Sequence, residues 1–533
     1  MFKKVFAIGL LFFATVSCQK EIDTPPNIVF IMSDDHAYQA ISAYGHGLNN
    51  TPNIDRIAQE GALFQKGFVT NSICAPSRAV MLTGKHSFVN GKVDNIQDFN
   101  WDQDNFAKHL QKGGYQTALI GKIHLRGLPQ GFDYSAVLPG QGHYYNPDFI
   151  IDGVKEQIEG YVTTITTHLA LDWLKNKRDK KQPFLLLYHQ KAPHRNWKPE
   201  EKYLTLFDDK TFDPPANFFD DYSNRGTAAK TQEMLIAATE QQIAEAHGDG
   251  GHGRWGHDFK MLTDPYGKDT GFENELKRFT PEQRAAWLAA YTPKNEAMKA
   301  QNLEGKELAL WKFNRYLKDY LRTIQSVDDG VGKVLDYLDQ EGLTENTIVV
   351  YTSDQGFYLG EHGWFDKRFM YEESLRTPLL MRYPKEIPAG SVVNHLVQNL
   401  DFAPTFLDYA GLPQPEDLQG ASFRNVVNQK GGEWRDAIYY TYYEYPSVHM
   451  VKRHYGVRTD RYKLIHFYYD IDEWEMYDLE KDPSEMNNIY NDPSYETVQK
   501  ELHERLIDLR EHYGDSDTLD QMHIERYLSS LNP

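Results

Sequence analysis

The stretch "CAPSRAVMLTG" carries the most distinctive chemistry in the chain. Cys74 is one of only two cysteines, and Ser77 and Arg78 follow it closely. Pro76 suits the first position of a helix and Gly84 the position just past its end, so we expect Cys74 beside a helix N-terminus. Free backbone N–H groups and the helix dipole favour an anion there and would stabilise negative charge at position 74. A buried apolar cysteine is the structural alternative.

Two apolar segments end in the same pattern of side chains. "NIVFIMSDDH" and "IVVYTSDQG" each begin as a short continuous apolar run, typical of a buried strand, and then give Ser-Asp and a second oxygen-bearing side chain. We therefore expect Asp34, Asp35, Asp354 and Gln355 at the carboxyl ends of strands. Open α/β sheets bind their ligands at that edge.

The segments that position these residues alternate helix and strand from Pro26 onwards. A helix is expected with Thr51 as its cap and Pro52 in its first turn. Helix, turn and strand then repeat in "NFAKHLQKGGYQTALIGK", "HLALDWLKNKRDKKQPFLLLYHQ" and "VGKVLDYLDQEGLTENTIVVYTSDQG". Repeated units of this kind predict a doubly wound, mostly parallel α/β sheet flanked by helices.

Two regions depart from this alternation. Residues 200–310 are rich in Gly, Asp, Pro and His and are typical of an insertion; the histidines of "AHGDGGHGRWGHDFK" lack tight ligand spacing, which favours a loop over a metal site. Residues 431–533 are dense in Tyr and β-formers and end in the helical stretch "YETVQKELHERLIDLREHYG". We predict a catalytic domain over 24–430 and a smaller C-terminal subdomain with an antiparallel sheet and a helix.

Composition limits the class of partner. The 533 residues are 40% hydrophobic and 25% charged, as in ordinary globular proteins. Aromatic residues make up 13%, which fits either sugar stacking or a large aromatic core. The formal charge of −19 argues against nucleic acid, because such binding needs an excess of Lys and Arg. An anionic substrate would therefore have to meet a local cationic pocket.

The first 18 residues are expected to be a signal peptide. Lys3 and Lys4 precede an apolar run that is too short to span a membrane as a mature helix. Cys18 follows small residues in a loose match to a bacterial lipobox, so a lipid anchor and plain cleavage both stay open. On either route the protein is exported, and Cys74 has no disulfide partner if Cys18 is acylated or removed.

Cys-x-Pro-Ser-Arg followed by a helix and Thr-Gly-Lys resembles the signature of the type I sulfatases. Further matching stretches occur in family order: "TPNIDRIAQEGALFQKGFV", "GYQTALIGKIHL", "KAPHRNW", "TSDQGFYLGEHGWFDKRFMYEESLRTPLLMR" and "YGVRTDRYKLI". The resemblance covers nearly the whole mature chain. It implies the alkaline phosphatase superfamily fold, an α/β core with a smaller C-terminal sheet.

The resemblance also implies cofactors. A maturation enzyme would convert Cys74 to Cα-formylglycine, whose hydrate attacks sulfur with one hydroxyl and expels sulfate with the other. Calcium would orient that group and polarise the sulfate, bound by the four side chains at the two strand ends, Asp34, Asp35, Asp354 and Gln355. Gln355 departs from the commoner Asn and is one carbon longer.

The remaining catalytic roles are carried over position by position. Arg78 matches the residue that braces the formylglycine. Lys122 and His124 match a sulfate-binding lysine and a histidine acting on the formylglycine hydroxyl, and their alternate spacing on a strand turns both to one face. His194 matches the general acid for the leaving oxygen, and Lys367 a second sulfate-binding lysine.

The sequence is most similar to bacterial N-acetylglucosamine-6-O-sulfatases, which implies a terminal sugar of glycosaminoglycans or mucin glycans as the substrate. Four residues are candidate sugar contacts, each with an equal structural alternative: His143, Tyr144, His449 and His454.

Three other functions stay open. A sulfatase for another sugar, such as 6-sulfated galactose or an algal polysaccharide, would share the core. A phosphonate or phosphate monoester hydrolase can share the formylglycine motif. A silent glycan-binding lipoprotein would be expected to lose site residues, and none is lost. The expected location is the periplasm or the outer membrane of a bacterium.

Overall fold

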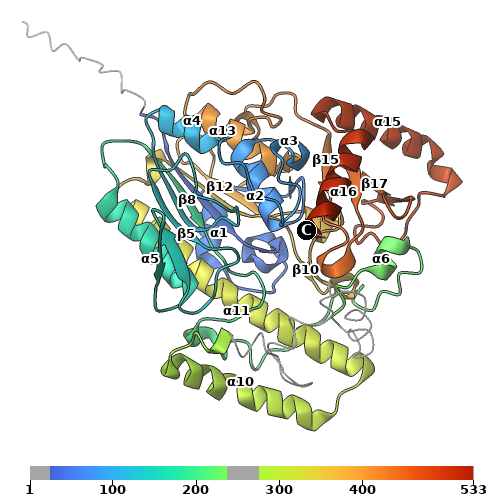
Figure 1. Cartoon of the computed structure of the whole chain (residues 1–533), viewed down its shortest axis with the longest axis horizontal. Coiled ribbons are helices and arrows are strands. Elements are labelled where there is room, and N and C mark those ends of the chain that lie inside the picture. Colours follow the sequence, from blue (N-terminus) through green and yellow to red (C-terminus); the bar gives the residue numbers. More distant parts are fainter. Residues whose placement is uncertain (1–23, 237–274, 532–533) are drawn as a thin grey trace, which may run out of the picture.

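A ten-stranded mixed sheet forms the centre of the computed structural model, which describes residues 24–236 and 275–531 (Figure 1). Its strands lie in the order β13 (Ser391–Val393), β2 (Ala62–Phe64), β12 (Leu379–Arg382), β9 (Thr347–Ser353), β1 (Asn27–Ser33), β8 (Phe184–His189), β4 (Gln116–Lys122), β5 (Tyr134–Leu138), β6 (Asp148–Ile151) and β7 (Val154–Gln157). The strands from β9 to β5 are parallel, whereas β12, β6 and β7 run antiparallel to their neighbours. The predicted mixed, mostly parallel sheet is confirmed.

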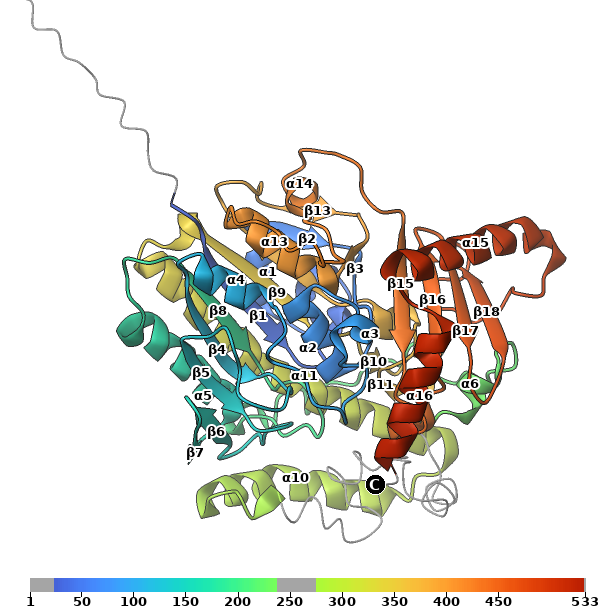
Figure 2. The same cartoon turned by 45° about the horizontal axis from the view of Figure 1, so that its top comes forward.

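Helices cover both faces of this sheet (Figures 1 and 2). One face carries α1 (Pro52–Gln59), α5 (Val162–Asp172) and α11 (Gly305–Gln340); the other carries α2 (Cys74–Thr83), α4 (Phe106–Lys112) and α13 (Phe402–Tyr409). Because both faces are covered, all seven residues of β1 are buried. Alternate residues of β1 therefore enter different cores: Ile31 packs on the α11 side, and Phe30 on the α13 side.

The two strands with matching ends are direct neighbours. β1 and β9 pair in parallel, and Ser33 lies opposite Ser353 at their carboxyl ends. This register brings the Ser-Asp ends of both segments to one point on the edge of the sheet, as predicted.

The start of α1 differs in detail from the prediction. Thr51 occupies the N-cap position, but its side chain caps no backbone N–H of the helix. Asp328 of α11 takes that role, because its Oδ1 accepts hydrogen bonds from the backbone N–H groups of Asn53 and Ile54 at 3.0 and 2.8 Å. A tertiary contact has replaced the local cap.

The C-terminal part is a separate four-stranded antiparallel sheet, as predicted. Its strands are β15 (Ala437–Tyr442), β16 (His454–Thr459), β17 (Tyr462–Phe467) and β18 (Glu473–Asp478), in that order. The predicted helix is α15 (Glu496–Tyr513), and a second helix, α16 (Asp517–Leu531), follows it (Figure 2).

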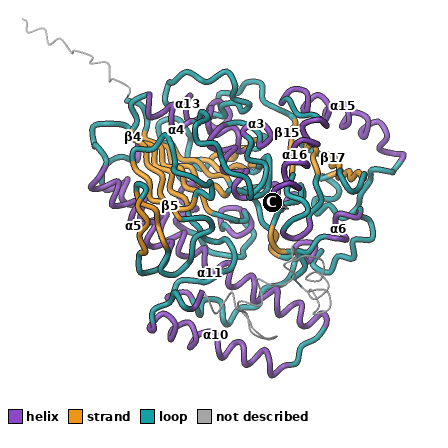
Figure 3. Tube along the Cα trace, in the orientation of Figure 1, coloured by secondary structure: helices purple, strands orange, loops and turns teal. Residues whose placement is uncertain are grey.

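Shorter elements complete the described chain (Figure 3). β3 (Gly67–Phe68) pairs with β14 (Val397–Gln398), and β10 (Tyr358–Leu359) pairs with β11 (Phe365–Asp366). The short helices are α3 (Ser87–Asn90), α6 (Thr227–Thr231), α12 (Glu372–Leu375) and α14 (Arg424–Val427).

The described residues of the expected insertion contribute no strand to the ten-stranded sheet; they form α6, α10 (Pro281–Gln301) and the start of α11. His247, His252 and His257 lie outside the described residues, as do the expected signal peptide and Cys18. Over the two described ranges, no helix is both long enough and apolar enough to cross a membrane.

Candidate active site

Cys74 is the first residue of α2, which begins two residues earlier than predicted. Gly84 ends this helix with a left-handed φ of 65°, and its N–H donates to the carbonyl of Val80. Cys74 is 1% exposed, and burial raises the pKa of its thiol to about 12, although the charge of Lys367 opposes this shift. The helix N-terminus therefore does not produce a thiolate here, and the unmodified side chain is a neutral thiol.

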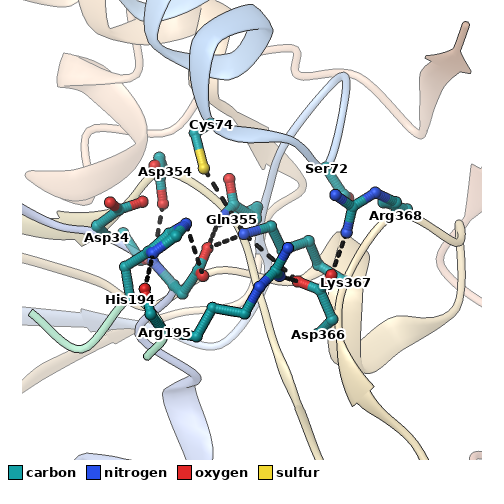
Figure 4. Close-up of polar contacts among 12 residues, drawn as sticks. Asp34, Ser72, Cys74, His194, Arg195, Asp354, Gln355, Asp366, Lys367 and Arg368 are labelled. Carbon is teal, nitrogen blue, oxygen red and sulfur yellow. Dashed lines mark hydrogen bonds and ion pairs between the residues drawn. The ribbon is translucent and has the colours of Figure 1, made fainter. Parts of the chain in front are cut away.

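The four side chains at the strand ends come together near Cys74, and Figure 4 shows three of them, Asp34, Asp354 and Gln355. Oxygen atoms of Asp34, Asp35 and Asp354 all lie within 4.8 Å of one another, and the three residues are completely buried. Gln355 lies beside them, with its amide nitrogen donating to Asp35 Oδ1. The predicted set is thus assembled in space.

Several oxygens of this group lack a hydrogen-bond donor within the described structure. They are Asp34 Oδ1, Asp35 Oδ2 and Gln355 Oε1, all buried. Burial raises the pKa of Asp35 to about 6, and the charges of Asp354 and Asp366 add to this shift while Lys367 opposes it. Crowded, unpartnered oxygens of this kind fit a hard divalent cation such as calcium.

Three buried cations surround the carboxylates. Arg78 Nε donates to Asp354 Oδ2 at 2.9 Å, and its Nη1 donates to the carbonyl of Lys122 at 2.6 Å. Lys122 Nζ contacts Asp34 Oδ2, and Lys367 Nζ lies 2.5 Å from Asp35 Oδ1 and 3.6 Å from Cys74 Sγ. All three predicted cations therefore lie at the predicted site.

The two predicted histidines also face this point. His194 Nε2 lies 3.8 Å from Asp35 Oδ2, while its Nδ1 contacts the carbonyl of Arg195. His124 lines the cavity, but β4 ends at Lys122, and His124 lies in the following loop with a φ of 55°. His124 therefore lies at the site as predicted, but it reaches the site from a loop and not through the alternation of side chains along β4. Burial, followed by the charge of Lys122, lowers the pKa of both imidazoles well below the usual value.

Cys74 opens into a cavity of about 430 Å³. Side chains from both parts of the chain line it, including several that match none of the predicted roles: Asn95, Lys191, Arg195, Lys198, Glu275, Arg368 and Glu444. Three of these lie close in sequence to predicted site residues. Lys191 comes three residues before His194 and Arg195 directly after it, and Arg368 follows Lys367. Glu275 and Glu444 carried no sequence signal.

Asp366 links two of these residues, Arg195 and Arg368 (Figure 4). Its Oδ1 lies 2.6 Å from Arg195 Nη1, and its Oδ2 contacts Arg368 Nη1 and lies 2.7 Å from His449 Nε2. Two arginines that meet at one carboxylate are held with their guanidinium groups at the edge of the cavity.

The predicted sugar contacts separate into two groups. His143 and Tyr144 line the cavity, and the Tyr144 hydroxyl donates a hydrogen bond to the carbonyl of His194. His449 does not line it and instead pairs with Asp366. His454 lies in β16 among the rings of an aromatic cluster, with Nδ1 2.8 Å from the carbonyl of Lys452. This placement does not support His454 as a sugar contact, because strand alternation turns it into the core.

Comparisons with known proteins agree with this geometry. The family model described as sulfatase matches residues 26–412, and a model for the C-terminal region of N-sulphoglucosamine sulphohydrolase matches residues 360–512. An N-acetylglucosamine-6-O-sulfatase of Bacteroides thetaiotaomicron is 50% identical over 510 residues, covering 94% of this chain and 88% of the relative.

Two solved structures extend the comparison. One, in complex with its substrate D-glucosamine-2-N,6-O-disulfate, is 50% identical, covers 93% of this chain and 99% of its own, and superposes with a TM-score of 0.87. The phosphonate monoester hydrolase of Agrobacterium radiobacter, at 20% identity and a TM-score of 0.63 over 92% of this chain and 96% of its own, shares the fold alone. Together with the site geometry, the matched family model and the 50% identical relative show that this chain belongs to the sulfatase family, as a carbohydrate sulfatase.

Proposed function

We propose that this sulfatase removes the 6-O-sulfate of N-acetylglucosamine in glycosaminoglycans or mucin glycans, with a formylglycine at position 74 and a calcium ion. The 50% identical relatives support the sugar, since one is an N-acetylglucosamine-6-O-sulfatase and the other binds a 6-O-sulfated glucosamine. The main structural support for this proposal is that three buried carboxylates and three buried cations surround Cys74 at the base of a cavity.

Four residues would hold the calcium ion: Asp34, Asp35, Asp354 and Gln355. Their unpartnered oxygens fit an oxygen-seeking cation. Turning the Gln355 amide over would place its oxygen beside Asp35 Oδ1, where the amide nitrogen now lies. When bound, calcium supplies a positive charge that polarises the sulfate and orients the group at position 74. It would also relieve the repulsion that raises the pKa of Asp35 above its usual value, a shift in which burial is the larger cause.

Position 74 needs a better nucleophile than the thiol. A buried, neutral thiol is a weak nucleophile, which supports its conversion by a maturation enzyme. Formylglycine supplies a hydrated aldehyde with one hydroxyl for attack and one for release of sulfate. Arg78 fixes the surroundings of this group, because its guanidinium spans Asp354 and the carbonyl of Lys122.

The chain's own cations would bind the sulfate. Lys367 Nζ already stands 3.6 Å from Sγ of Cys74, so an oxygen of a sulfate placed over residue 74 lies within its reach. Lys122 approaches from the end of β4 on the other side of Asp34. These buried charges supply the positive field that an acidic protein lacks elsewhere.

His194 would handle the proton of the leaving sugar oxygen. The carbonyl of Arg195 can only accept, so the contact assigns the proton of the neutral ring to Nδ1 and leaves Nε2 facing the site. Burial and the charges of Lys122 and Lys367 lower the pKa of His194 well below its usual value. A bound sulfate ester offsets those cations and raises the pKa of His194 toward the range where Nε2 carries a proton. His124 would act on the hydroxyl at position 74.

The sugar would be held by the outer cavity wall. His143 and Tyr144 line it, and the arginines that meet at Asp366 stand beside it. Export to the periplasm or the outer membrane, with or without a lipid on Cys18, completes the proposal and matches glycan substrates outside the cell. No nucleic acid is expected as a partner.

Metal dependence tests the core of this proposal. Enzyme produced with a maturation enzyme, and shown by mass spectrometry to carry formylglycine at position 74, should release sulfate from N-acetylglucosamine-6-sulfate. A chelator should abolish this release and calcium should restore it. Full activity in the chelated enzyme would contradict the assigned role of Asp34, Asp35 and Asp354, and faster turnover of phosphonate monoesters would contradict the sulfatase substrate.

A further inference from the structure

Lys191 is a buried cation in the cavity to which the proposed chemistry gives no role. Its side chain is 3% exposed and lines the cavity with His194 and Tyr144. The ammonium nitrogen stands 4.7 Å from the centroid of the Tyr144 ring. Within residues 24–236 and 275–531, no carboxylate forms an ion pair with it.

Glu275, the acidic residue whose charge acts most strongly on Lys191, is already engaged. The charge of Glu275 acts on Lys191 and raises the pKa of the ammonium group, but burial outweighs it and lowers that pKa to about 8. Glu275 directs Oε1 to His143 Nδ1 at 2.8 Å and Oε2 to Lys198 Nζ at 3.6 Å. Lys191 therefore faces the cavity as a positive charge without its own counterion. Burying such a charge is unfavourable unless a ligand supplies the anion.

Lys191 also lies on a different element from the sulfate-binding lysines. Lys122 ends β4 and Lys367 follows β11, whereas Lys191 and Lys198 belong to the loop after β8. This loop forms one wall of the cavity with the segment 141–144. The first pair can bind the 6-O-sulfate over Cys74, which leaves Lys191 to bind another anion.

We propose that Lys191, with Lys198 beside it, forms a second anion subsite that binds a further negatively charged group of the substrate. The group is either an N-sulfo substituent on the same glucosamine or the carboxylate of a neighbouring uronic acid. This inference rests on the proposed 6-O-sulfated glucosamine substrate. A uronic acid would extend the N-acetylated sugar by one residue, whereas an N-sulfo group would take the place of its N-acetyl group. The substrate in the related complex carries a 2-N-sulfate in addition to its 6-O-sulfate.

Binding to a protein that does not turn over tests the subsite directly. In a Cys74→Ser background with calcium, calorimetry would give Kd for N-acetylglucosamine-6-sulfate, for glucosamine-2-N,6-O-disulfate and for a disaccharide that links the first sugar to a uronic acid. One of the two doubly anionic ligands should bind about tenfold to a hundredfold more tightly than the singly charged sugar. The ligand that shows this advantage identifies the second anion.

The Lys191→Met variant should remove that advantage and bring the Kd values to within about twofold of each other. It keeps the length of the side chain without the buried charge, so folding should not suffer. Lys191→Arg should retain the advantage, and Lys202→Met, a half-exposed lysine paired with Asp329 on α11, serves as a matched control.

An equal loss of affinity for all three ligands in Lys191→Met would overturn the proposal, because Lys191 would then act on the shared 6-O-sulfate. An unchanged ratio of Kd values would overturn it as well. Failure of the parent protein to bind any of the three sugars would instead contradict the proposed glucosamine substrate, so the two failures are distinct.

Discussion

His86 offers a quantitative test of how the catalytic part packs on the C-terminal subdomain. Its side chain is completely buried, with its ring centroid 4.4 Å from that of Tyr513 and 5.2 Å from that of Phe88. Neither ring nitrogen has a hydrogen-bond partner in the described structure. Burial lowers the pKa of His86 from 6.5 to about 3, and the charges of Arg435 and His512 add to this shift.

The sign of the pH effect follows from that shift. The folded protein keeps His86 neutral, whereas the unfolded chain takes up a proton below pH 6.5. The unfolded state therefore binds more protons as the pH falls, and the free energy of unfolding decreases. With folded and unfolded pKa values of about 3 and 6.5, His86 alone destabilises the fold by about 2 kcal/mol at pH 5 relative to pH 8.

The His86→Phe variant removes the titrating group and keeps an aromatic ring among aromatic neighbours. Equilibrium urea unfolding at pH 8 and pH 5 should show that the variant loses about 2 kcal/mol less than the wild type on acidification. His395→Phe, at an exposed histidine, should leave the pH dependence unchanged. Parallel pH profiles for the wild type and His86→Phe would refute the assignment of a buried, neutral imidazole.

Three further substitutions test the site. Cys74→Ser should bind calcium and substrate but give no sustained turnover, and continued sulfate release by this variant would exclude a formylglycine mechanism. His194→Ala should slow a sugar sulfate about 10²-fold to 10⁴-fold and an activated aryl sulfate far less; equal losses on both, measured as kcat/KM, would remove His194 as the general acid. Arg78→Met should cost about 3–5 kcal/mol in calcium-free protein, because it leaves Asp354 buried without its cation, whereas Asp34 keeps Lys122; Arg56→Met at the surface should cost at most about 1 kcal/mol. Added calcium should recover part of the Arg78→Met loss, and the same denaturation midpoint with and without calcium would contradict a shared cation site.

Local sequence patterns predicted the sheet and the convergence of its strand ends. β1 and β9 are buried along their whole length and apolar through the middle, and Ser33 and Ser353 mark where each strand stops. In a parallel α/β sheet the carboxyl ends of the strands share one edge, so the sequence places Asp34 and Asp354 at that edge, whereas the direct pairing of β1 with β9 is seen only in the structure. The C-terminal sheet was also predictable from its dense β-forming residues.

Contacts between distant segments could not be predicted in this way. α2 starts at Cys74 rather than Pro76, where the N–H of Ala75 donates to Asn95 Oδ1, and His124 reaches the site through a left-handed turn rather than along β4. The meeting of Arg195 and Arg368 at Asp366 joins segments about 170 residues apart, which no local pattern reveals. His454 was predicted as a sugar contact from its residue type alone, but its side chain lies in an aromatic core.

Sulfate release from two sugars tests the central claim most directly. Matured enzyme, with formylglycine confirmed at position 74 and calcium present, would be given N-acetylglucosamine-6-sulfate and galactose-6-sulfate separately. Release from the glucosamine sugar alone is the result that the structure and its relatives predict. Release from galactose-6-sulfate alone would contradict the proposed substrate. The absence of sulfate release from both sugars would contradict the assignment of this cavity to a terminal 6-O-sulfated hexosamine.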